Sequence, residues 1–324
     1  MNKDHIYDML IIGGGPAGYT AAIYAARAGM DAVVLEKLSA GGQMALTEQI
    51  DNYPGFEEGI DGFTLGEKMQ AQADRFGSQT AYAEVLALDL AVEPKKAETS
   101  EGVFYGRTVV LATGAGPKKL GLAGEDSLAG RGVAYCASCD GMFYKGKTVA
   151  VIGGGNSAAA DALLLSRIAA KVILVHRRDA LRADKVSQRM LLNAPNIELR
   201  WNSRVTALLQ GGGRPCTEDG SDGTASGRLT GLRLQGVESG EESTLACDGV
   251  FISVGRKPQT RLVAGRLSLD KDGYVVAGET TKTNIPGVYA AGDVRTKPLR
   301  QVVTAVADGA AAVHEAQSYL AART

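Results

Sequence analysis

The feature that most constrains this chain of 324 residues is a glycine-rich turn that occurs twice. The first copy, residues 13–18, follows the apolar run 9–12, and the second, residues 153–158, follows the apolar run 148–152. Each copy then enters a stretch rich in small residues, so the pattern predicts strand, tight turn and helix. Such a turn lets the backbone approach a pyrophosphate at a helix N-terminus. Two copies therefore predict an α/β chain with two dinucleotide sites.

A single copy would be weak evidence, because ordinary glycine turns are common in α/β sheets. Two copies, each between a strand and a helix, are much stronger. We expect the first turn to contact one dinucleotide through Gly13, Gly15, Pro16, Ala17 and Gly18. We expect the second turn to contact another through Gly153, Gly155, Asn156, Ser157 and Ala158.

The two copies carry different charges at the same offset. Glu36 lies 23 residues after Gly13, where a carboxylate accepts hydrogen bonds from ribose hydroxyls. The same offset in the second copy falls on a basic run made of His176, Arg177, Arg178 and, one turn later, Arg182. A 2′-phosphate is repelled by a carboxylate and held by guanidinium groups, so the second site is predicted to prefer NADP(H) over NAD(H). The alternative for the basic run is a solvated surface.

Composition excludes several classes of protein. The chain has 35 basic and 36 acidic side chains, so no polybasic face is expected for nucleic acid. No apolar run reaches the ~18 residues that a membrane span needs, and residues 1–8 are polar rather than signal-like. The three histidines are far apart, so no metal site is expected. We therefore expect a cytoplasmic protein without a nucleic-acid or membrane partner.

The closely spaced pair Cys136 and Cys139 requires a chemical explanation, because structural disulfides are rare in cytosolic proteins. Two thiols at this spacing can close a small disulfide ring that is readily reduced and reformed, with one thiol activated by a nearby helix N-terminus. Asp140 is placed to move protons during that exchange. The alternatives are half of a zinc site, which lacks a second cysteine pair, and two inert buried thiols. Cys216 and Cys247 are expected to be free thiols.

The motifs, taken in their order, resemble the bacterial-type, low-molecular-weight thioredoxin reductases over nearly the whole chain. The segments that carry the resemblance are 13–18, 41–43, 52–55, 112–114, 136–141, 176–178, 291–293 and 300–301. Glutathione-reductase-like relatives carry their dithiol in the first nucleotide domain with a wider spacing, and that pattern is absent from this sequence.

The resemblance implies an α/β fold of two Rossmann-like, three-layer ββα domains, with an NADPH domain inserted in an FAD domain. The FAD domain would comprise residues 1–116 and 249–324, and the NADPH domain with its Cys-x-x-Cys pair residues 117–248. Glycine and proline mark both expected crossings, at 114–117 and 255–258. Residues 211–227 are predicted to form a long hairpin loop.

The resemblance also implies which residues bind each cofactor. Beyond the first turn, the FAD residues would be Glu36, Lys37, Gly41, Gly42, Gln43, Asn52, Val85, Ala112, Thr113, Gly114, Gly292, Asp293, Arg300, Gln301 and Val302. Asp293 would close the strand 287–293 and bind the FAD ribityl chain. A helix over about 300–320 would point its N-terminus at the isoalloxazine and stabilise negative charge on the reduced flavin. Beyond the second turn, the NADPH residues would be those of the basic run.

The implied activity is that of an NADPH-dependent thioredoxin-disulfide reductase, a cytoplasmic homodimer. Electrons would pass from NADPH through FAD and the Cys136–Cys139 disulfide to thioredoxin, with the inserted domain rotating between half-reactions. Cys139 would face the flavin, Cys136 would attack thioredoxin, and Asp140 would serve as acid and base. Arg131 and Phe143 flank the dithiol and are candidates for touching thioredoxin.

Other functions remain open from the sequence. The same redox machinery could serve a glutaredoxin-like protein or a small-molecule dithiol. A redox sensor that reduces its flavin without turning over a substrate is a second alternative. Electron transfer to ferredoxin is disfavoured, because such relatives lack the dithiol. Two departures from the family bear on docking: the long loop 211–227, and Met142 before Phe143 where an aromatic pair is common.

Overall fold

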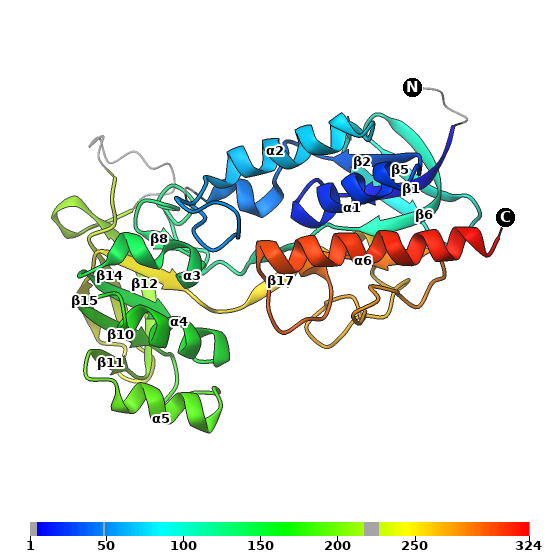
Figure 1. Cartoon of the computed structure of the whole chain (residues 1–324). Helices are drawn as coiled ribbons and strands as arrows, with labels where there is room; N and C mark the ends of the chain where they lie inside the picture. Colours follow the sequence, from blue (N-terminus) through cyan, green and yellow to red (C-terminus); the bar gives the residue numbers. More distant parts are fainter. Residues whose placement is uncertain (1–4, 48, 217–226, 324) are drawn as a thin grey trace. The chain divides into compact units, whose positions relative to one another are not determined.

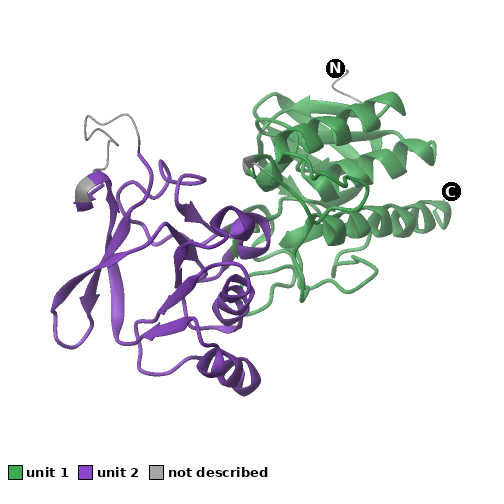
Figure 2. Ribbon diagram, turned by 60° about the vertical axis from the view of Figure 1, so that its left-hand side comes forward, with its two compact units in different colours: residues 1–116, 257–324 green, residues 117–256 purple. Residues whose placement is uncertain are grey.

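The computed structural model of the protein describes residues 5–47, 49–216 and 227–323. The chain forms two compact units, unit 1 from residues 1–116 and 257–324 and unit 2 from residues 117–256 (Figure 2). The second crossing lies between Arg256 and Lys257 rather than at 248/249. The reason is that β16 (Gly249–Ile252) pairs with two strands of unit 2.

Unit 1 is built in three layers (Figure 1). The middle layer is a parallel sheet of β3 (Gln79–Tyr82), β2 (Ala32–Glu36), β1 (Ile6–Ile12), β6 (Gly102–Leu111) and β18 (Val288–Ala290). An antiparallel layer adds β5 (Lys95–Thr99) and β4 (Val85–Asp89) to the first half of β6. The helical layer comprises α1 (Pro16–Arg27), α2 (Gly62–Arg75) and α6 (Val302–Ala321).

The central strand β1 explains why the sequence there is apolar without alternation. Met9 and Ile11 lie in the core beneath the helices, whereas Leu10 and Ile12 lie in the core that faces the antiparallel strands. Successive side chains of a strand point to opposite faces, so a strand covered on both faces must be apolar throughout. β1 is therefore buried on both sides, and it delivers the first glycine turn at its carboxyl end.

Helices α1 and α6 approach each other closely at small residues. A Cβ at Gly309 of α6 would strike the carbonyl oxygen of Ala17, and a Cβ at Gly292 would lie 3.0 Å from the Ala17 Cβ. Ala21 and Ala312 are fully buried in the same core. The first turn of α1 is thereby packed directly against residues from the end of the chain.

Unit 2 repeats the three-layer arrangement with a separate second sheet. Its parallel sheet has the order β11 (Ile197–Arg200), β10 (Lys171–Val175), β9 (Thr148–Ile152), β16 and β8 (Val133–Ala134). Its antiparallel sheet has the order β13 (Arg214–Pro215), β12 (Ser203–Gln210), β14 (Gly231–Gly236) and β15 (Glu242–Ala246). Its helices are α3 (Ala137–Asp140), α4 (Asn156–Ser166) and α5 (Lys185–Asn193).

Short elements complete the fold. The two segments at which the chain crosses between units, β7 (Ala115–Pro117) and β17 (Arg256–Pro258), pair with each other as a two-stranded sheet. The 3-10 turns are η1 (Gly42–Leu46), η2 (Gly141–Tyr144), η3 (Gly211–Gly213), η4 (Arg261–Val263) and η5 (Gly292–Val294). Within the described parts of the chain, no helix combines the length and the apolar character that crossing a bilayer requires.

The structure departs from two expectations of local structure. The strand expected over 287–293 ends at Ala290, and Asp293 lies in η5, because Gly292 turns the chain with φ +78°. The chain also turns back at η3, so that β13 pairs with β12 and the backbone N–H of Cys216 donates to the carbonyl oxygen of Leu208. Cys216 is thus half-buried against the core rather than in an open loop. The rest of that loop, residues 217–226, lies outside the described residues.

Substituting Gly309→Ala should destabilise unit 1, although alanine is usually the better helix former. The helix preference favours alanine by about 1 kcal/mol, but the new Cβ meets backbone of α1 that cannot rotate away. Overpacking of this kind costs about 1–3 kcal/mol, so we expect a net loss of up to ~2 kcal/mol in urea unfolding followed by circular dichroism. The matched control is Gly278→Ala, where a Cβ meets nothing within 4 Å. Equal stability of the two variants would contradict this account of the α1–α6 contact.

Candidate functional site

The first glycine turn forms a cradle that side chains would fill. Gly13 has φ +107°, and a Cβ there would lie 2.7 Å from the carbonyl oxygen of Ala112. A Cβ at Gly18 would strike the carbonyl oxygen of Gly13. A Cβ at Gly15, in contrast, would meet nothing within 4 Å. The fold therefore requires glycine at positions 13 and 18. Gly15 leaves open space above the backbone.

That open space is bordered by unpaired helix-terminal donors. Gly15 is the N-cap of the 12-residue helix α1, Pro16 follows it, and no side chain caps the helix. The backbone of Gly41 donates to the carbonyl oxygen of Gly14 at 2.8 Å, and a Cβ at Gly42 would lie 3.4 Å from the Gly15 Cα. Free N–H groups and the positive end of the helix dipole favour an anion. The cradle thus fits a pyrophosphate.

Glu36 at the end of β2 is fixed by the same turn. Its Oε2 accepts from the backbone N–H of Gly14 at 2.6 Å, and its Oε1 accepts from the N–H groups of Lys37 and Leu38 at 2.8 and 3.1 Å. Each carboxylate oxygen has two lone pairs, and Oε2 has accepted only one hydrogen bond, so it can still accept from a ribose hydroxyl. The Lys37 ammonium pairs with the Glu84 carboxylate at 2.9 Å rather than with Glu36.

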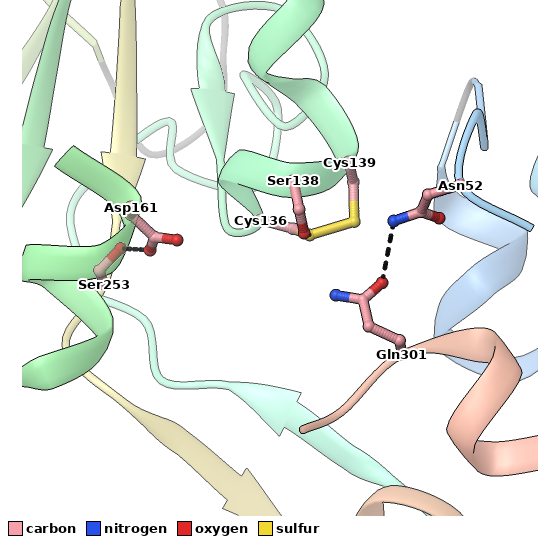
Figure 3. The surroundings of a disulfide bond; sticks show 7 residues. All are labelled: Asn52, Cys136, Ser138, Cys139, Asp161, Ser253 and Gln301. Atoms are coloured by element: carbon pink, nitrogen blue, oxygen red, sulfur yellow. Dashed lines mark hydrogen bonds between the residues drawn. A yellow bond between two sulfur atoms is a disulfide. The ribbon is translucent and has the colours of Figure 1, made fainter. Parts of the chain in front are cut away.

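Residues far apart in the sequence meet at the N-terminus of α6. Gln301 is the N-cap of this helix and exchanges hydrogen bonds with Thr304, and its Oε1 accepts from the amide of Asn52 at 3.2 Å (Figure 3). The loop 51–57 around Asn52 lines a hollow of about 640 Å³. Arg300 stacks over the Tyr274 ring at 3.9 Å and donates to the carbonyl oxygen of Asp293 at 3.4 Å. Asn52 with Gln301 and Asp293 with Arg300 therefore form two hydrogen-bonded pairs, and the neighbouring residues 300 and 301 belong one to each pair.

Other expected FAD residues have structural partners. The Thr113 hydroxyl donates to the carbonyl oxygen of Gln259 at 2.8 Å, and Gly114 accepts from the Gln259 N–H at 2.9 Å. These bonds hold the end of β6 to the segment where the chain returns to unit 1. Val85 is buried in the core of the sheet, so any contact with FAD falls to its backbone. The carbonyl group of Ala112 lies beside Gly13 and forms part of the wall of the glycine cradle.

The second glycine turn forms a similar cradle in unit 2. A Cβ at Gly153 would lie 2.5 Å from the carbonyl oxygen of Ser253 and 2.7 Å from the Ala158 Cβ, whereas a Cβ at Gly155 would meet nothing within 4 Å. Gly155 is the N-cap of α4 and, like its counterpart in unit 1, has no side-chain cap. The Asn156 side chain accepts from the N–H of Asp184 at 2.8 Å. This cradle also fits a pyrophosphate.

His176 is not one of the cations of this site, contrary to the expectation from the sequence. Its ring is 6% exposed and lies against Gly154, where a Cβ would strike the imidazole. Burial lowers the pKa of His176, and the charges of Arg178 and Arg182 lower it further. The positive charge therefore comes from the exposed side chains of Arg177, Arg178 and Arg182. The backbone N–H of Arg182 donates to the Gly154 carbonyl oxygen at 2.7 Å, which ties the basic loop to the cradle.

Cys136 and Cys139 form a disulfide, with their Cα atoms 5.3 Å apart. Both cysteines are half-exposed, at the start and within the single turn of α3, and the Ser138 hydroxyl lies 3.4 Å from the Cys136 sulfur (Figure 3). Asp140 follows directly and is also half-exposed. The arrangement offers a partner access to a sulfur while holding an ionisable group beside it.

The base of the dithiol turn is anchored, and its outer rim is exposed. A Cβ at Gly141, directly after α3, would lie 3.2 Å from Leu165 of α4 and 3.4 Å from Ile168, so the end of the dithiol turn packs closely against α4. Met142 and Phe143 are 57% and 46% exposed.

Cys247 is buried, and burial raises the pKa of its thiol to about 12, which leaves it unreactive at neutral pH.

The comparisons with known proteins agree with this geometry. The family model described as pyridine nucleotide-disulphide oxidoreductase matches residues 7–309. A thioredoxin reductase of Listeria monocytogenes is 42% identical over 319 residues, covering 98% of this chain and 95% of that protein. A thioredoxin reductase of Bacillus subtilis is 39% identical over 320 residues, covering 99% and 96%. The crystal structure of a thioredoxin reductase from Streptococcus pyogenes aligns with a TM-score of 0.85 at 38% identity, covering 98% and 99%.

The chain belongs to the thioredoxin reductase family. Members of this family contain FAD and take electrons from NADPH, and the chain is an oxidoreductase of this kind. The expected fold of two Rossmann-like units, one inserted in the other, is confirmed. The disulfide in unit 2 corresponds to the redox-active disulfide of the family.

Sequence reasoning missed two carboxyl groups, the half-buried Asp161 and the buried Asp308. The Ser253 hydroxyl donates to Asp161 of α4 (Figure 3), and burial raises the pKa of Asp161. Asp308 of α6 binds Arg295 and Lys297. The sequence did hold a signal for Asp308. This aspartate lies three residues after Ala305 and four before Ala312, on the helix face that faces the core.

The depressed pKa of His176 predicts that unit 2 loses stability in mild acid. Below about pH 6.5 the unfolded chain binds a proton at this residue more readily than the folded one. The free energy of unfolding should therefore fall as the pH drops from 6.5 toward the folded pKa. Trp201, the sole tryptophan, packs edge-on against His176, so its fluorescence reports unfolding of this unit.

The variant His176→Gln should lose this acid dependence between pH 7.5 and 5.5. The control His314→Gln removes an exposed histidine of unit 1 and should retain it. Parallel pH profiles for the wild type and His176→Gln would show that the histidine is not the group responsible.

Proposed function

We propose that the chain is a thioredoxin reductase that uses NADPH and FAD to keep the Cys136–Cys139 pair reduced, and that this pair reduces the disulfide of oxidised thioredoxin. The observation that carries the proposal is the half-exposed Cys136–Cys139 disulfide in a chain with two glycine cradles. A carboxylate lies beside the first cradle and arginines lie beside the second. A structural disulfide needs no access to solvent, whereas a disulfide that exchanges with a protein partner does.

The two cradles receive different dinucleotides in this proposal. Unit 1, with the Glu36 carboxylate at its ribose position, would hold FAD, and unit 2, with its three exposed arginines, would hold NADPH. The flavin end of FAD would meet Asn52, Asp293, Arg300 and Gln301. When bound, FAD supplies the two-electron chemistry that links NADPH to the disulfide.

The chain's own chemistry is thiol–disulfide exchange. The Cys136 thiolate attacks one sulfur of the thioredoxin disulfide, a mixed disulfide forms, and the second thioredoxin sulfur leaves and takes a proton. The Cys139 thiolate then attacks Cys136, which restores the Cys136–Cys139 bond and releases the first thioredoxin sulfur as a thiolate that is then protonated. Two electrons and two protons pass to thioredoxin. Asp140, beside Cys139, would give and take the protons.

The partner and assembly are also part of the proposal. Arg131 and the exposed Phe143 would contact thioredoxin beside the disulfide. Nicotinamide and disulfide both belong to unit 2, so we propose that this unit moves about the paired strands β7 and β17 between half-reactions. The family resemblance supports a cytoplasmic homodimer.

Single serine substitutions in the pair should separate the two thiol roles. Cys139→Ser should reduce NADPH-driven turnover of thioredoxin at least ~10³-fold, because no resolving thiol remains, and after pre-reduction it should trap a covalent adduct through Cys136. Cys136→Ser should be equally inactive and trap little adduct. The control Cys216→Ser, outside the pair, should keep full activity.

A panel of oxidised partners identifies the substrate in the same assay. Faster turnover of a glutaredoxin-like protein or a small dithiol than of thioredoxin would contradict the proposed partner. Reduction of the flavin by NADPH without turnover of any disulfide would contradict the enzymatic function itself.

The arginine loop should decide coenzyme preference. Replacing Arg177 and Arg178 together by glutamine removes charge-assisted hydrogen bonds worth roughly 1.5–3 kcal/mol each. The KM for NADPH should rise at least about 100-fold, while the KM for NADH should change less than about twofold. Arg189→Gln, an exposed arginine on α5, is the control. Equal changes in both constants would remove the basis for assigning the 2′-phosphate to this loop.

A further inference from the structure

A single buried carboxylate holds the segment that carries Asp293. Asp308 of α6 is 6% exposed, and its oxygens accept from the backbone N–H of Gly292 at 2.8 Å and from Lys297 Nζ at 2.7 Å. Arg295 adds two bonds, from Nε at 2.8 Å and from its terminal nitrogen at 2.6 Å. All four donors come from residues 292–297, so this segment is tied to one side chain on the helix.

The cluster contains more positive than negative charge. The side chains of Arg295 and Lys297 are each 5% exposed, and Asp308 is the carboxylate that pairs with both. Burial alone raises the pKa of Asp308, but the hydrogen bonds from Arg295 and Lys297 outweigh it and lower the pKa. The carboxylate is therefore ionised at neutral pH. Removing its charge would leave two buried cations unpaired, which is strongly unfavourable.

The cluster lies behind the first turn of α1 and on both sides of Asp293. Gly292, whose N–H binds Asp308, packs against Ala17, and Gly309, next to Asp308 on α6, does the same. Beyond Asp293, Arg300 donates to the carbonyl oxygens of Asp293 and Arg295 at 3.4 and 3.3 Å. Asp308 thus connects the turn at Asp293 with the N-terminal turns of α6.

We propose that Asp308 is a positioning residue for the flavin half of FAD. It fixes η5 and the start of α6 relative to each other, so that Asp293, Arg300 and Gln301 face the ligand in a preformed arrangement. The ADP half is held by the glycine cradle and by Glu36, which is fixed by Gly14, Lys37 and Leu38 rather than by Asp308. The inference rests on the proposed assignment of FAD to unit 1.

The two halves of the ligand make the proposal testable. The probes are FAD and ADP, titrated into the flavin-free full-length chain by flavin fluorescence and calorimetry, together with FAD release from the holoprotein. In Asp308→Asn the Kd for FAD should rise at least 10-fold, while the Kd for ADP should stay within twofold of the wild type. An aspartate that only stabilises the fold of unit 1 would weaken both ligands alike. A parallel loss of FAD and ADP affinity, or no change in either, would overturn the proposal.

A charge-matched double variant adds an independent readout. Asp308→Asn combined with Lys297→Met removes one of the two unpaired cations, so the Kd for FAD should recover part of the way toward the wild type. Lys297→Met alone removes the hydrogen bonds of Nζ to Asp308 and to the Thr304 carbonyl oxygen, and it should raise the Kd for FAD two- to fivefold with ADP unchanged. If Asp308→Asn does not fold, this single variant still decides the question, since an unchanged Kd for FAD would overturn the proposal.

Asp293→Ala separates this inference from the assignment beneath it. If Asp293→Ala leaves the Kd for FAD unchanged, the placement of Asp293 at the flavin is wrong, whatever Asp308→Asn does. If Asp293→Ala weakens FAD and Asp308→Asn does not, the placement holds and the positioning role of Asp308 is wrong.

Discussion

The structure depends on the close approach of backbone to backbone at the carboxyl ends of two central strands. At Gly13 and Gly153 the chain passes so near a neighbouring carbonyl group that a Cβ has no room. That approach lets a strand, a turn and a helix N-terminus converge, and it leaves unpaired N–H groups facing open space. The two units repeat this backbone geometry, and their side chains then distinguish them. In one unit a carboxylate accepts from the turn, and in the other a neutral histidine lies beneath it with arginines around it.

The strand and helix framework could be predicted because its signals are local. The continuous apolar run of β1 followed at once by glycines left little choice about strand and turn, and the 23-residue offset located Glu36 at the end of β2. The nested organisation required the resemblance to a known family, since proline and glycine at 114–117 and 255–258 mark connections without saying which strands they join. The second boundary was misplaced because the pairing of β16 with β9 is not visible in the sequence.

The parts of the site that could not be predicted depend on contacts between distant segments. The charge of His176 follows from burial against Gly154, so the sequence pattern suggested a cation where the fold keeps a neutral ring. The bond between Asn52 and Gln301 joins residues 249 positions apart. Asp308 could be recognised as an unusual residue on an apolar helix face, but its partners became apparent only when the turn after β18 was located.

The insertion of unit 2 has a consequence for the order in which the protein is made. The core of unit 1 includes Tyr289 of β18 together with Ala305, Ala312 and Val313 of α6, all of which follow unit 2 in the chain. During synthesis, every strand and helix of unit 2 has emerged before the residues that complete this core exist. The inserted unit can therefore reach its final structure first. The apolar face of β1, α1 and α2 stays uncovered until α6 has been synthesised.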